Sequence, residues 1–358
     1  MPNDHTLFTR VQDYYADLVI RLESAHQAIS MVCLAFEDGQ WSRRIANAMV
    51  ARAAAGVKVR LMVDELGQLS DEPHHILSNH KILAEFRSAG VQVDIFQPKS
   101  KGLSIRNRMH CKFCAVDDET IYLGGSNVGD YYTTWSDTNL RVDGPLGDKL
   151  HVIYDYLRSF SFADPPLASQ PYLSDLEIGD DRLLFIIPGK QLDIRHALLK
   201  LIKEADRSIH LRTWYFLPDA EILDALCTQA QNGIQVNVLL SHRTRVRPVD
   251  LANSIPIHRL VCAGGRVCRY TGRYMHAKTT WNNLGTVLLG SANLDHSSMN
   301  NNFESCLLLQ DQDLACQLQQ AFEADLPTCI LQTPESFHRQ NLPVKFLSHA
   351  CYLVSPWL

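Results

Sequence analysis

The chain has 358 residues, of which 46% are hydrophobic and 20% are charged, as expected for a globular protein of two domains. Its net charge of −5 argues against a long nucleic acid as partner, because binding to a phosphate backbone favours a basic protein. No uncharged apolar run reaches the ~18 residues of a membrane span, and the first residues do not read as a signal peptide. The sequence therefore predicts neither a spanning helix nor secretion.

The first half of the chain alternates helical and strand patterns. The elements expected there are a helix near 8–25, a strand over 28–36, a helix near 41–55, a strand over 57–63, a helix near 76–89 and a strand over 91–96. Gly56 and Gly90 directly follow two of these helices, where glycine commonly ends a helix.

The second half repeats this order. The elements expected there are a strand over 208–216, a helix over 220–232, a strand over 234–240, a helix near 249–263 and a strand over 266–270. Such alternation indicates α/β layers with much parallel pairing. A stretch rich in proline and small residues separates the halves. We expect domains over 1–162 and 175–332, a linker over 163–174 and a tail over 333–358.

One motif occurs in both halves. The first copy reads MHCKFCAVDDETIYLGGSN from Met109, and the second reads MHAKTTWNNLGTVLLGSAN from Met275. The matching positions are His110 and His276, Lys112 and Lys278, Asp117 and Asn283, Gly124 and Gly290, and Asn127 and Asn293, with the carboxylates Asp137 and Glu304 further along. Two matches in register over this length make coincidence a poor explanation.

The spacing within the motif favours an anion as ligand. Residues two apart on a strand share a face, so each His and its Lys should point the same way. A duplicated strand pair kept only for folding is the alternative, but it does not account for the paired His and Lys. Cys111 and Cys114 should point to opposite faces, so we expect packing there and not zinc. The ten cysteines form no regular framework and indicate reduced thiols of a cytosolic protein.

The repeated HxKxxxxD pattern, followed by GGSN and GSAN, resembles the phospholipase D superfamily, and within it the bacterial cardiolipin synthases and their soluble relatives. The segments that carry this resemblance are GVKVRLMVDELG at 56–67, GGSNVGDYYTTWSDTNLRVDGP at 124–145, GSANLD at 290–295 and NNFE at 301–304. It extends from about residue 10 to about residue 326. The resemblance implies two α/β/α sandwich domains, related by a pseudo-twofold axis, with one active site at their interface.

Phosphodiester chemistry requires that negative charge on the non-bridging oxygens be neutralised. Lys112 and Lys278, with the amides of Asn127 and Asn293, suit this task. Ser126 and Ser291, which precede the two asparagines, are further candidates for substrate binding. No acidic cluster with metal-ligand spacing is present, and the chemistry expected needs neither a metal nor a cofactor.

A second requirement is a nucleophile together with a group that protonates the leaving alkoxide. Two imidazoles on opposite sides of the phosphorus suit these roles. The resemblance implies that His110 is the nucleophile, forming a phosphohistidine, and that His276 is the general acid and base. Asp137 and Glu304 should hold the other imidazole nitrogens.

The chain departs from the family pattern in three places. The second motif ends in Asn283 where Asp is usual, as it also does in tyrosyl-DNA phosphodiesterases, and the family's Asp is regarded as structural. We nevertheless keep Asp117 and Asn283 in the catalytic set. The basic residue expected shortly after GSANLD is absent, with His296 in that stretch. The paired N-terminal membrane helices of the main cardiolipin synthases are also missing, so we expect a short, peripheral type.

Basic residues flank the motifs and could form a cationic entrance to the site, although a solvated charged face is the alternative. These residues are Lys99, Lys101, Arg106 and Arg108 before the first motif, and Arg243, Arg245 and Arg247 in the second half. His74 and His75 lie in a polar loop and read as surface residues.

The apolar tail predicts a helix from about Pro343 to Pro356. Its apolar face would comprise Phe346, Leu347, Ala350, Cys351 and Val354, with Lys345, Ser348, His349 and Tyr352 opposite. One hypothesis is an interfacial helix that docks on a membrane, and the other is a helix packed on the protein's own core.

The leading functional prediction is a cardiolipin synthase-like phosphatidyltransferase that acts on phospholipids. The alternatives are a hydrolytic phospholipase D or phosphodiesterase, a nuclease, which the net charge disfavours, and a non-catalytic lipid-binding module, which the intact His and Lys pairs disfavour. The partners expected are phospholipid substrates and a membrane surface, without nucleic acid. The expected location is cytoplasmic, with peripheral binding to the inner face of the cytoplasmic membrane as a hypothesis.

Overall fold

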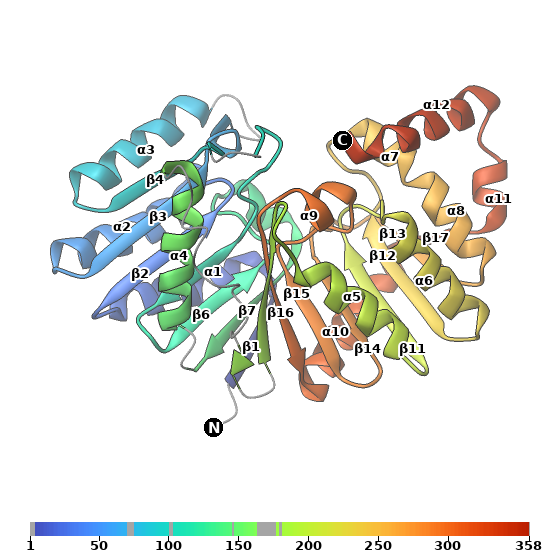
Figure 1. Cartoon of the computed structure of the whole chain (residues 1–358), viewed down its shortest axis with the longest axis horizontal. Helices are drawn as coiled ribbons and strands as arrows, with labels where there is room; N and C mark the ends of the chain where they lie inside the picture. The colour runs from blue at the N-terminus through green and yellow to red at the C-terminus, as the bar shows by residue number, and fades with distance from the viewer. Residues whose placement is uncertain are drawn as a thin grey trace.

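The computed structural model describes residues 4–69, 75–99, 103–144, 147–162, 177–178 and 181–357. Figure 1 shows two helix-flanked sheets side by side, which we call the N-terminal half (residues 4–162) and the C-terminal half (residues 177–357). The predicted linker over 163–174 lies outside the described residues, as do His74 and Lys101.

The N-terminal half contains a seven-stranded sheet in the order β1-β7-β6-β5-β2-β3-β4. Its elements are β1 (Asp4–Arg10), α1 (Val11–Ser24), β2 (Ala28–Cys33), α2 (Gln40–Ala54), β3 (Lys58–Asp64), α3 (Ile76–Ser88), β4 (Gln92–Phe96), β5 (Phe113–Val116), β6 (Thr120–Gly124), β7 (Ser136–Asp143) and α4 (Gly147–Phe162). The strands β2, β3 and β4 are parallel, and the other neighbours pair antiparallel.

The C-terminal half contains a larger sheet in the order β10-β9-β16-β15-β14-β11-β12-β13-β17, with β8 paired to β9. Its strands are β8 (Glu177–Ile178), β9 (Asp181–Ile187), β10 (Gln191–Leu192), β11 (Ser208–Thr213), β12 (Gln235–Ser241), β13 (Arg266–Tyr270), β14 (Thr279–Asn282), β15 (Thr286–Gly290), β16 (Glu304–Gln310) and β17 (Cys329–Leu331). Its helices are α5 (Asp193–Glu204), α6 (Ala220–Gln231), α7 (Arg247–Ala252), α8 (Ser254–Cys262), α9 (His296–Asn300), α10 (Gln312–Asp325), α11 (Pro334–His338) and α12 (Leu342–Leu353).

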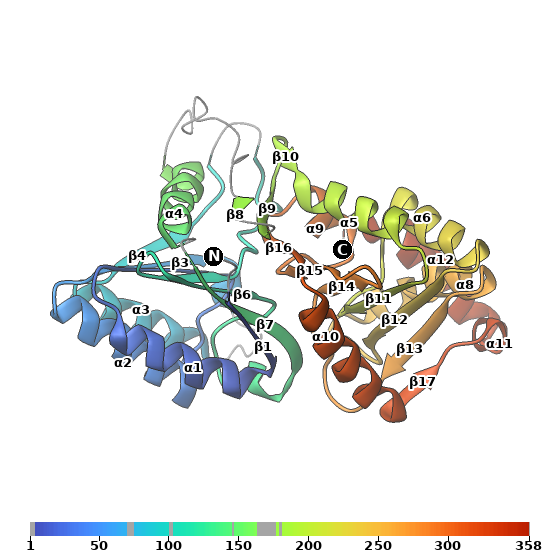
Figure 2. The same ribbon diagram turned by 90° about the horizontal axis from the view of Figure 1, so that it is seen from below.

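The two halves are structural repeats. In strand order, β9, β16, β15, β14, β11, β12 and β13 take the places of β1, β7, β6, β5, β2, β3 and β4. Figure 2 shows α1, α2 and α3 on one face of the first sheet with α4 on the other, and α5, α6 and α8 opposite α10 in the second. The predicted class of two α/β/α layered repeats related by a pseudo-twofold axis is confirmed.

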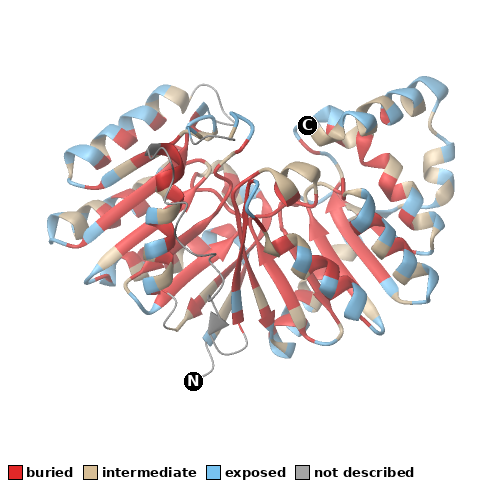
Figure 3. Cartoon of the chain, viewed as in Figure 1, coloured by how far each residue is buried: buried red, intermediate tan, exposed pale blue. Residues whose placement is uncertain are grey.

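The two halves share one apolar core, and each half also has an apolar core of its own. The shared cluster contains Leu157 of α4 and Leu318 of α10, together with Leu140 of β7 and Leu307 of β16. Figure 3 shows that the strands are buried along most of their length, including where the two sheets meet. Burial of apolar surface across this boundary fixes the halves relative to each other.

The predicted helices and strands lie within a few residues of the observed ones, with two corrections. The first predicted helix begins only at Val11, because the preceding residues form β1 and pair with β7. The helix predicted near 249–263 is divided at Asn253 into α7 and α8. Gly56 and Gly90 follow their helices with φ values of 88° and 86°, which glycine adopts most readily.

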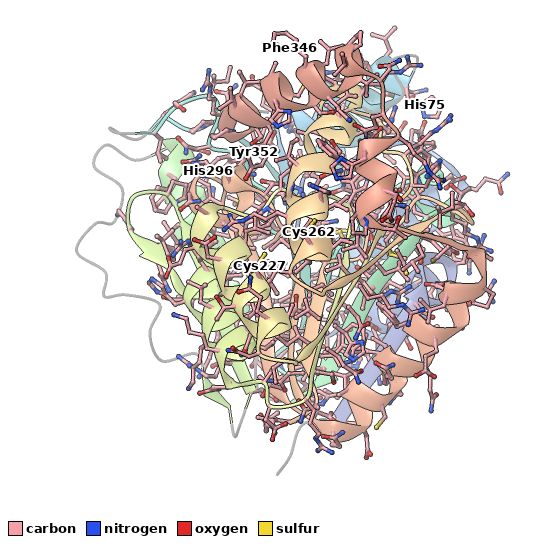
Figure 4. All side chains as sticks on the ribbon, turned by 90° about the vertical axis from the view of Figure 1, so that its right-hand side faces the viewer. His75, Cys227, Cys262, His296, Phe346 and Tyr352 are labelled. Atoms are coloured by element: carbon pink, nitrogen blue, oxygen red, sulfur yellow. The ribbon has the colours of Figure 1, made fainter. Side chains whose placement is uncertain are left out.

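The tail forms the predicted helix as α12, and part of its predicted polar side meets the protein. Ser348, predicted opposite the apolar face, is fully buried, and Tyr352 packs with the small cluster around Val249. By contrast, Phe346 is 75% exposed and lies at the outer edge in Figure 4. Ser348 and Tyr352, on the predicted polar side, therefore meet the protein body, whereas Phe346, on the predicted apolar side, points away from it. Among the described residues, no helix has the length and hydropathy needed to cross a membrane.

Candidate active site

The two histidines lie where the halves exchange backbone hydrogen bonds. His110 comes shortly before β5, and its N–H donates to the carbonyl of Phe303 at 2.9 Å. His276 comes shortly before β14, and its N–H donates to the carbonyl of Ser136 at 2.7 Å. Each His-bearing segment therefore pairs with the start of a strand from the other half, namely β16 and β7.

This pairing places a carboxylate of the opposite half against each imidazole. His110 Nδ1 is 2.8 Å from Glu304 Oε1 and 2.9 Å from Oε2, and His276 Nδ1 is 2.7 Å from Asp137 Oδ2. Burial raises the pKa of Asp137, but the charge and hydrogen bond of His276 outweigh it, and the net shift is downward. An ionised carboxylate accepts from Nδ1–H, which directs the Nε2 atom to the reaction.

The two lysines are buried beside the histidines. Lys112 Nζ donates to the carbonyl of His110 at 3.0 Å, and Lys278 Nζ donates to the carbonyl of His276. Burial lowers the pKa of Lys112 to about 8 and that of Lys278 to about 7. An anion bound between them would oppose this desolvation and favour both ammonium groups.

The predicted substrate-binding residues divide into two groups. The side chains of Asn127 and Asn293 are 5% exposed, and their Oδ1 atoms have no hydrogen-bond partner within the described part of the chain. Ser126 Oγ instead donates to Asp137 at 3.0 Å, and Ser291 Oγ donates to Glu304. In this geometry each serine hydroxyl supports the carboxylate that contacts a motif histidine, and substrate binding by the serines stays a prediction.

Of the two motif histidines, His276 is the one with aromatic ring contacts in the described part of the chain. The ring centroids of Trp135 and Trp214 each lie 4.7 Å from that of His276, and Lys278 Nζ lies 5.9 Å from the Trp214 ring. Burial, followed by the charge of Lys278, lowers the pKa of His276 to about 3. Burial also lowers the pKa of His110, with the charge of Glu304 opposing it. Sequence reasoning missed both tryptophans, because neither belongs to the repeated motif.

Comparison with known proteins agrees with this geometry. Residues 18–156 and 198–326 match the family described as "Cardiolipin synthase, PLD-like domain". The chain belongs to this phospholipase D-like family.

Named relatives and solved structures resemble the chain over nearly its full length. It is 29% identical to a cardiolipin synthase of Staphylococcus aureus (strain Mu50) and 30% identical to cardiolipin synthase 1 of Staphylococcus epidermidis (strain RP62A). Each alignment covers 99% of this chain and 74% of the relative. The fold matches phosphatidylserine synthase of Haemophilus influenzae with a TM-score of 0.79 and 14% identity, over 99% of this chain and 95% of that one. A polyphosphate kinase of Porphyromonas gingivalis matches with a TM-score of 0.63 and 15% identity, over 93% of this chain and 49% of that one.

The last motif position of this phospholipase D-like chain is a backbone anchor. Asp117 accepts hydrogen bonds from the backbone N–H groups of His26, Gln27 and Ala28, and Asn283 accepts from those of Arg207 and Ser208. Asp117 thus ties the turn after β5 to the start of β2, and Asn283 ties the turn after β14 to the start of β11. Both contacts lie at the strand end that is remote from the motif histidine. These contacts are structural, in line with the role that the resemblance implies for this motif position, and a catalytic role for Asp117 and Asn283 stays a prediction.

The basic residues near the motifs have different surroundings. Arg108 forms an ion pair with the buried Asp64, and Arg106 is exposed. In the other half, the Arg245 guanidinium lies 5.0 Å from the Tyr131 ring centroid, and Arg243 is exposed. A single cationic entrance is therefore too simple, because at least one of these charges is neutralised within the protein.

Proposed function

We propose that this chain is a phosphatidyltransferase that moves a phosphatidyl group from one phospholipid to a hydroxyl of another. The observation that carries the proposal is the pair of imidazoles held by carboxylates of opposite halves, with a buried lysine beside each. Two such groups from two halves can address one phosphorus from opposite sides. The cardiolipin synthases among the relatives support a phospholipid as substrate.

In the first step, Nε2 of His110 attacks the phosphorus while the bond from phosphorus to the leaving oxygen breaks. His276 donates a proton to that oxygen, and Lys112 and Lys278 neutralise the non-bridging oxygens. In the second step, the acceptor hydroxyl attacks phosphorus, its proton passes to His276, and the phosphorus–nitrogen bond breaks. Without substrate the His276 pKa is about 3, so His276 takes up from solvent the proton that it donates, when the charge of the bound anionic substrate opposes the lowering.

The site also requires access to lipids, and we propose that the protein docks peripherally on a membrane surface. Leu342, Phe346 and Leu353 on α12 are 80%, 75% and 75% exposed, and Leu77 on α3 is 84% exposed. Figure 1 shows α3 and α12 at the upper edge of the two halves, with α9 lower down between them. Exposed apolar side chains on that edge could enter the membrane interface, which the net charge of −5 would not by itself attract.

The activity can be tested by lipid mass spectrometry after incubation with phosphatidylglycerol vesicles. A phosphatidyltransferase produces a lipid with four acyl chains together with free glycerol, whereas a hydrolase produces phosphatidic acid and glycerol. We expect the four-chain product, and its loss in the His110→Ala variant. Phosphatidic acid as the sole lipid product would overturn transfer in favour of hydrolysis.

A further inference from the structure

A cavity of about 440 Å³ lies in the C-terminal half, at the end of the sheet remote from the motif histidines. It is bounded by α10 and by the first residues of β11 and β12. Asn283, which follows β14, lines the cavity, whereas His276 precedes the same strand. The cavity is therefore separate from the active site, and we call it the His210 cavity after the histidine in its wall.

The equivalent place in the N-terminal half is filled by an arginine. Strand register there places Ser30 of β2 opposite Arg60 of β3. Arg60 is 2% exposed, and its guanidinium donates to Ser30 Oγ at 2.7 Å and to Asp155 of α4 at 2.8 Å. In the C-terminal half the corresponding pair is His210 and Asn237. Asn237 is much shorter than arginine, so the same space stays open in this half.

The two halves also differ in the charge that faces this space. Asp155, which pairs with Arg60, lies five residues beyond Leu150, a core residue of α4. Gln319, which lines the His210 cavity, lies five residues beyond Leu314, a core residue of α10. An uncharged amide thus replaces the acid, so the open space does not select a cation as the filled one does.

Carboxamide side chains are prominent in the lining of the His210 cavity. They are Gln235, Asn282, Asn283, Gln312 and Gln319. The amides of Asn282 and Asn283 bond to neighbouring backbone groups and shape the wall. Gln319 donates to Glu323 at 2.8 Å, which leaves its carbonyl oxygen as an acceptor. Because a carboxamide both donates and accepts, the glutamines can meet a ligand that does the same.

His210 adds a ring whose hydrogen-bonding capacity the protein does not use. Its side chain is 8% exposed, and Nδ1 is buried without a hydrogen-bond partner in the described residues. The ring stacks on that of Trp281, with 5.2 Å between centroids and 10° between planes. Burial lowers the pKa of His210 to about 4 against the opposing charge of Glu323, so the imidazole is neutral near pH 7. The corresponding residues of the first half, Ser30 and Ala115, supply no ring.

The charges at the rim of the cavity oppose one another. Arg207 lines the cavity, and its Nε lies 3.6 Å from Asp206 Oδ1. A phosphate group would therefore meet a neutral imidazole and an arginine that already has a counterion. An acyl chain would leave the amides without partners, which is unfavourable where water is excluded. The lining suits an uncharged, flat ligand that both donates and accepts hydrogen bonds.

We propose that the His210 cavity binds a nucleobase, as the free base or as its nucleoside. The flat ring packs along the wall formed by His210 and Trp281, and its N–H and carbonyl groups bond to the imidazole and the glutamines. A volume of about 440 Å³ falls within the ~300–1,000 Å³ of small-molecule sites. The site is independent of the proposed transfer reaction, because its lining includes none of the motif histidines and lysines.

Calorimetric titration of the full-length protein with cytidine, uridine, adenosine and guanosine tests this site. Ribose and inorganic phosphate control for the sugar and for an anion. The variants are His210→Phe, which keeps the stack on Trp281 but removes the ring nitrogens, and Gln319→Leu. The matched control is His258→Phe, which replaces a histidine stacked on Phe337 outside the cavity. Thermal unfolding and donor consumption without nucleoside should match the unaltered protein in all three variants.

We expect at least one nucleoside to bind with a Kd on the order of 10⁻⁴ M, one molecule per chain. Loss of a hydrogen bond should weaken its binding about tenfold in His210→Phe and in Gln319→Leu, and His258→Phe should bind as the unaltered protein does. If His210→Phe does not fold, Gln319→Leu decides the test. The assignment is overturned if none of the four nucleosides binds at millimolar concentration, if the cavity variants bind as tightly as the unaltered protein, or if phosphate or ribose displaces the nucleoside.

Discussion

At the scale of single residues, the site depends on carboxylates that are distant in sequence from the histidines they contact. Sequence analysis could predict His110, His276 and their lysines, because the repeated spacing is local. It could also nominate Asp137 and Glu304, but not which imidazole each would hold. That pairing is set by backbone contacts between the halves, and such contacts leave no periodic signal in the sequence.

The orienting role of Asp137 gives a first prediction. In Asp137→Asn, the neutral amide should hold His276 in a less suitable tautomer and no longer stabilise an imidazolium, so kcat should fall roughly 10²–10⁴-fold. Asp143→Asn, at the opposite end of β7, is the matched control and should retain full kcat. Steady-state kinetics measure kcat for both variants, and equal kcat values would contradict the orienting role of Asp137.

The buried lysines give a second prediction, for the pH dependence of kcat/KM, which reports the free enzyme. Burial sets the pKa of Lys278 at about 7 and that of Lys112 at about 8. Each ammonium exists below its pKa, so kcat/KM should decline as pH rises through about 7 to 8. In Lys278→Arg the guanidinium stays charged, so the alkaline decline should move upward even if the maximum is lower. A profile that stays level to about pH 9.5 would show that the lysines are not titrating as described.

At the scale of elements, local patterns predicted most helices and strands of both halves, because apolar strands and glycine-terminated helices are local signals. The strand β1 was missed, because its residues do not alternate clearly between buried and exposed positions and because α1 follows it directly. Sequence analysis also left open which face of α12 packs on the protein. Ser348 is inside because α12 packs against α7, and a helix periodicity cannot reveal which neighbour covers a polar residue.

The exposed side of α12 gives the third prediction. Replacing Phe346 and Leu353 with Ser should leave the free energy of unfolding nearly unchanged, because both side chains are 75% exposed. The same change should reduce co-sedimentation with phosphatidylglycerol vesicles, while cleavage of a short-chain soluble phosphodiester is retained.

The matched control for this experiment is Ser348→Asp on the buried side of the same helix. An unpaired charge there should destabilise the protein by about 2 kcal/mol or more. If the Phe346→Ser, Leu353→Ser double variant binds vesicles as well as the unaltered protein, the docking surface is not on α12.

At the scale of the whole molecule, the two halves act as one body because they share a core and tie their edges together. His5 of β1 contacts Asp181 at 2.9 Å and Asp311 at 2.7 Å, both in the C-terminal half. The hydrogen bond to Asp181 raises the pKa of His5, burial opposes the shift, and Asp311 adds to it. Sequence alone could not predict these contacts, since they join His5 to residues 176 and 306 positions away in the chain.

This contact gives the fourth prediction. A histidine whose pKa is raised on folding stabilises the protein fully below its unfolded pKa of 6.5, and the contribution is lost as pH rises through the folded pKa. His5→Gln should therefore cost roughly 1 kcal/mol near pH 6 and much less near pH 9. Chemical denaturation at both pH values measures the difference, and a cost that is independent of pH would contradict an ion pair.

The central claim is that one site, made by both halves, transfers a phosphatidyl group through His110. The most direct test uses a phosphatidyl aryl ester, whose leaving group needs no acid, with the His276→Ala variant. Peptide mass spectrometry after an alkaline quench should find the phosphatidyl group on His110 and nowhere else, and no adduct should form in His110→Ala. An adduct on another residue, or none in His276→Ala although the unaltered protein turns over the same ester, would contradict the account.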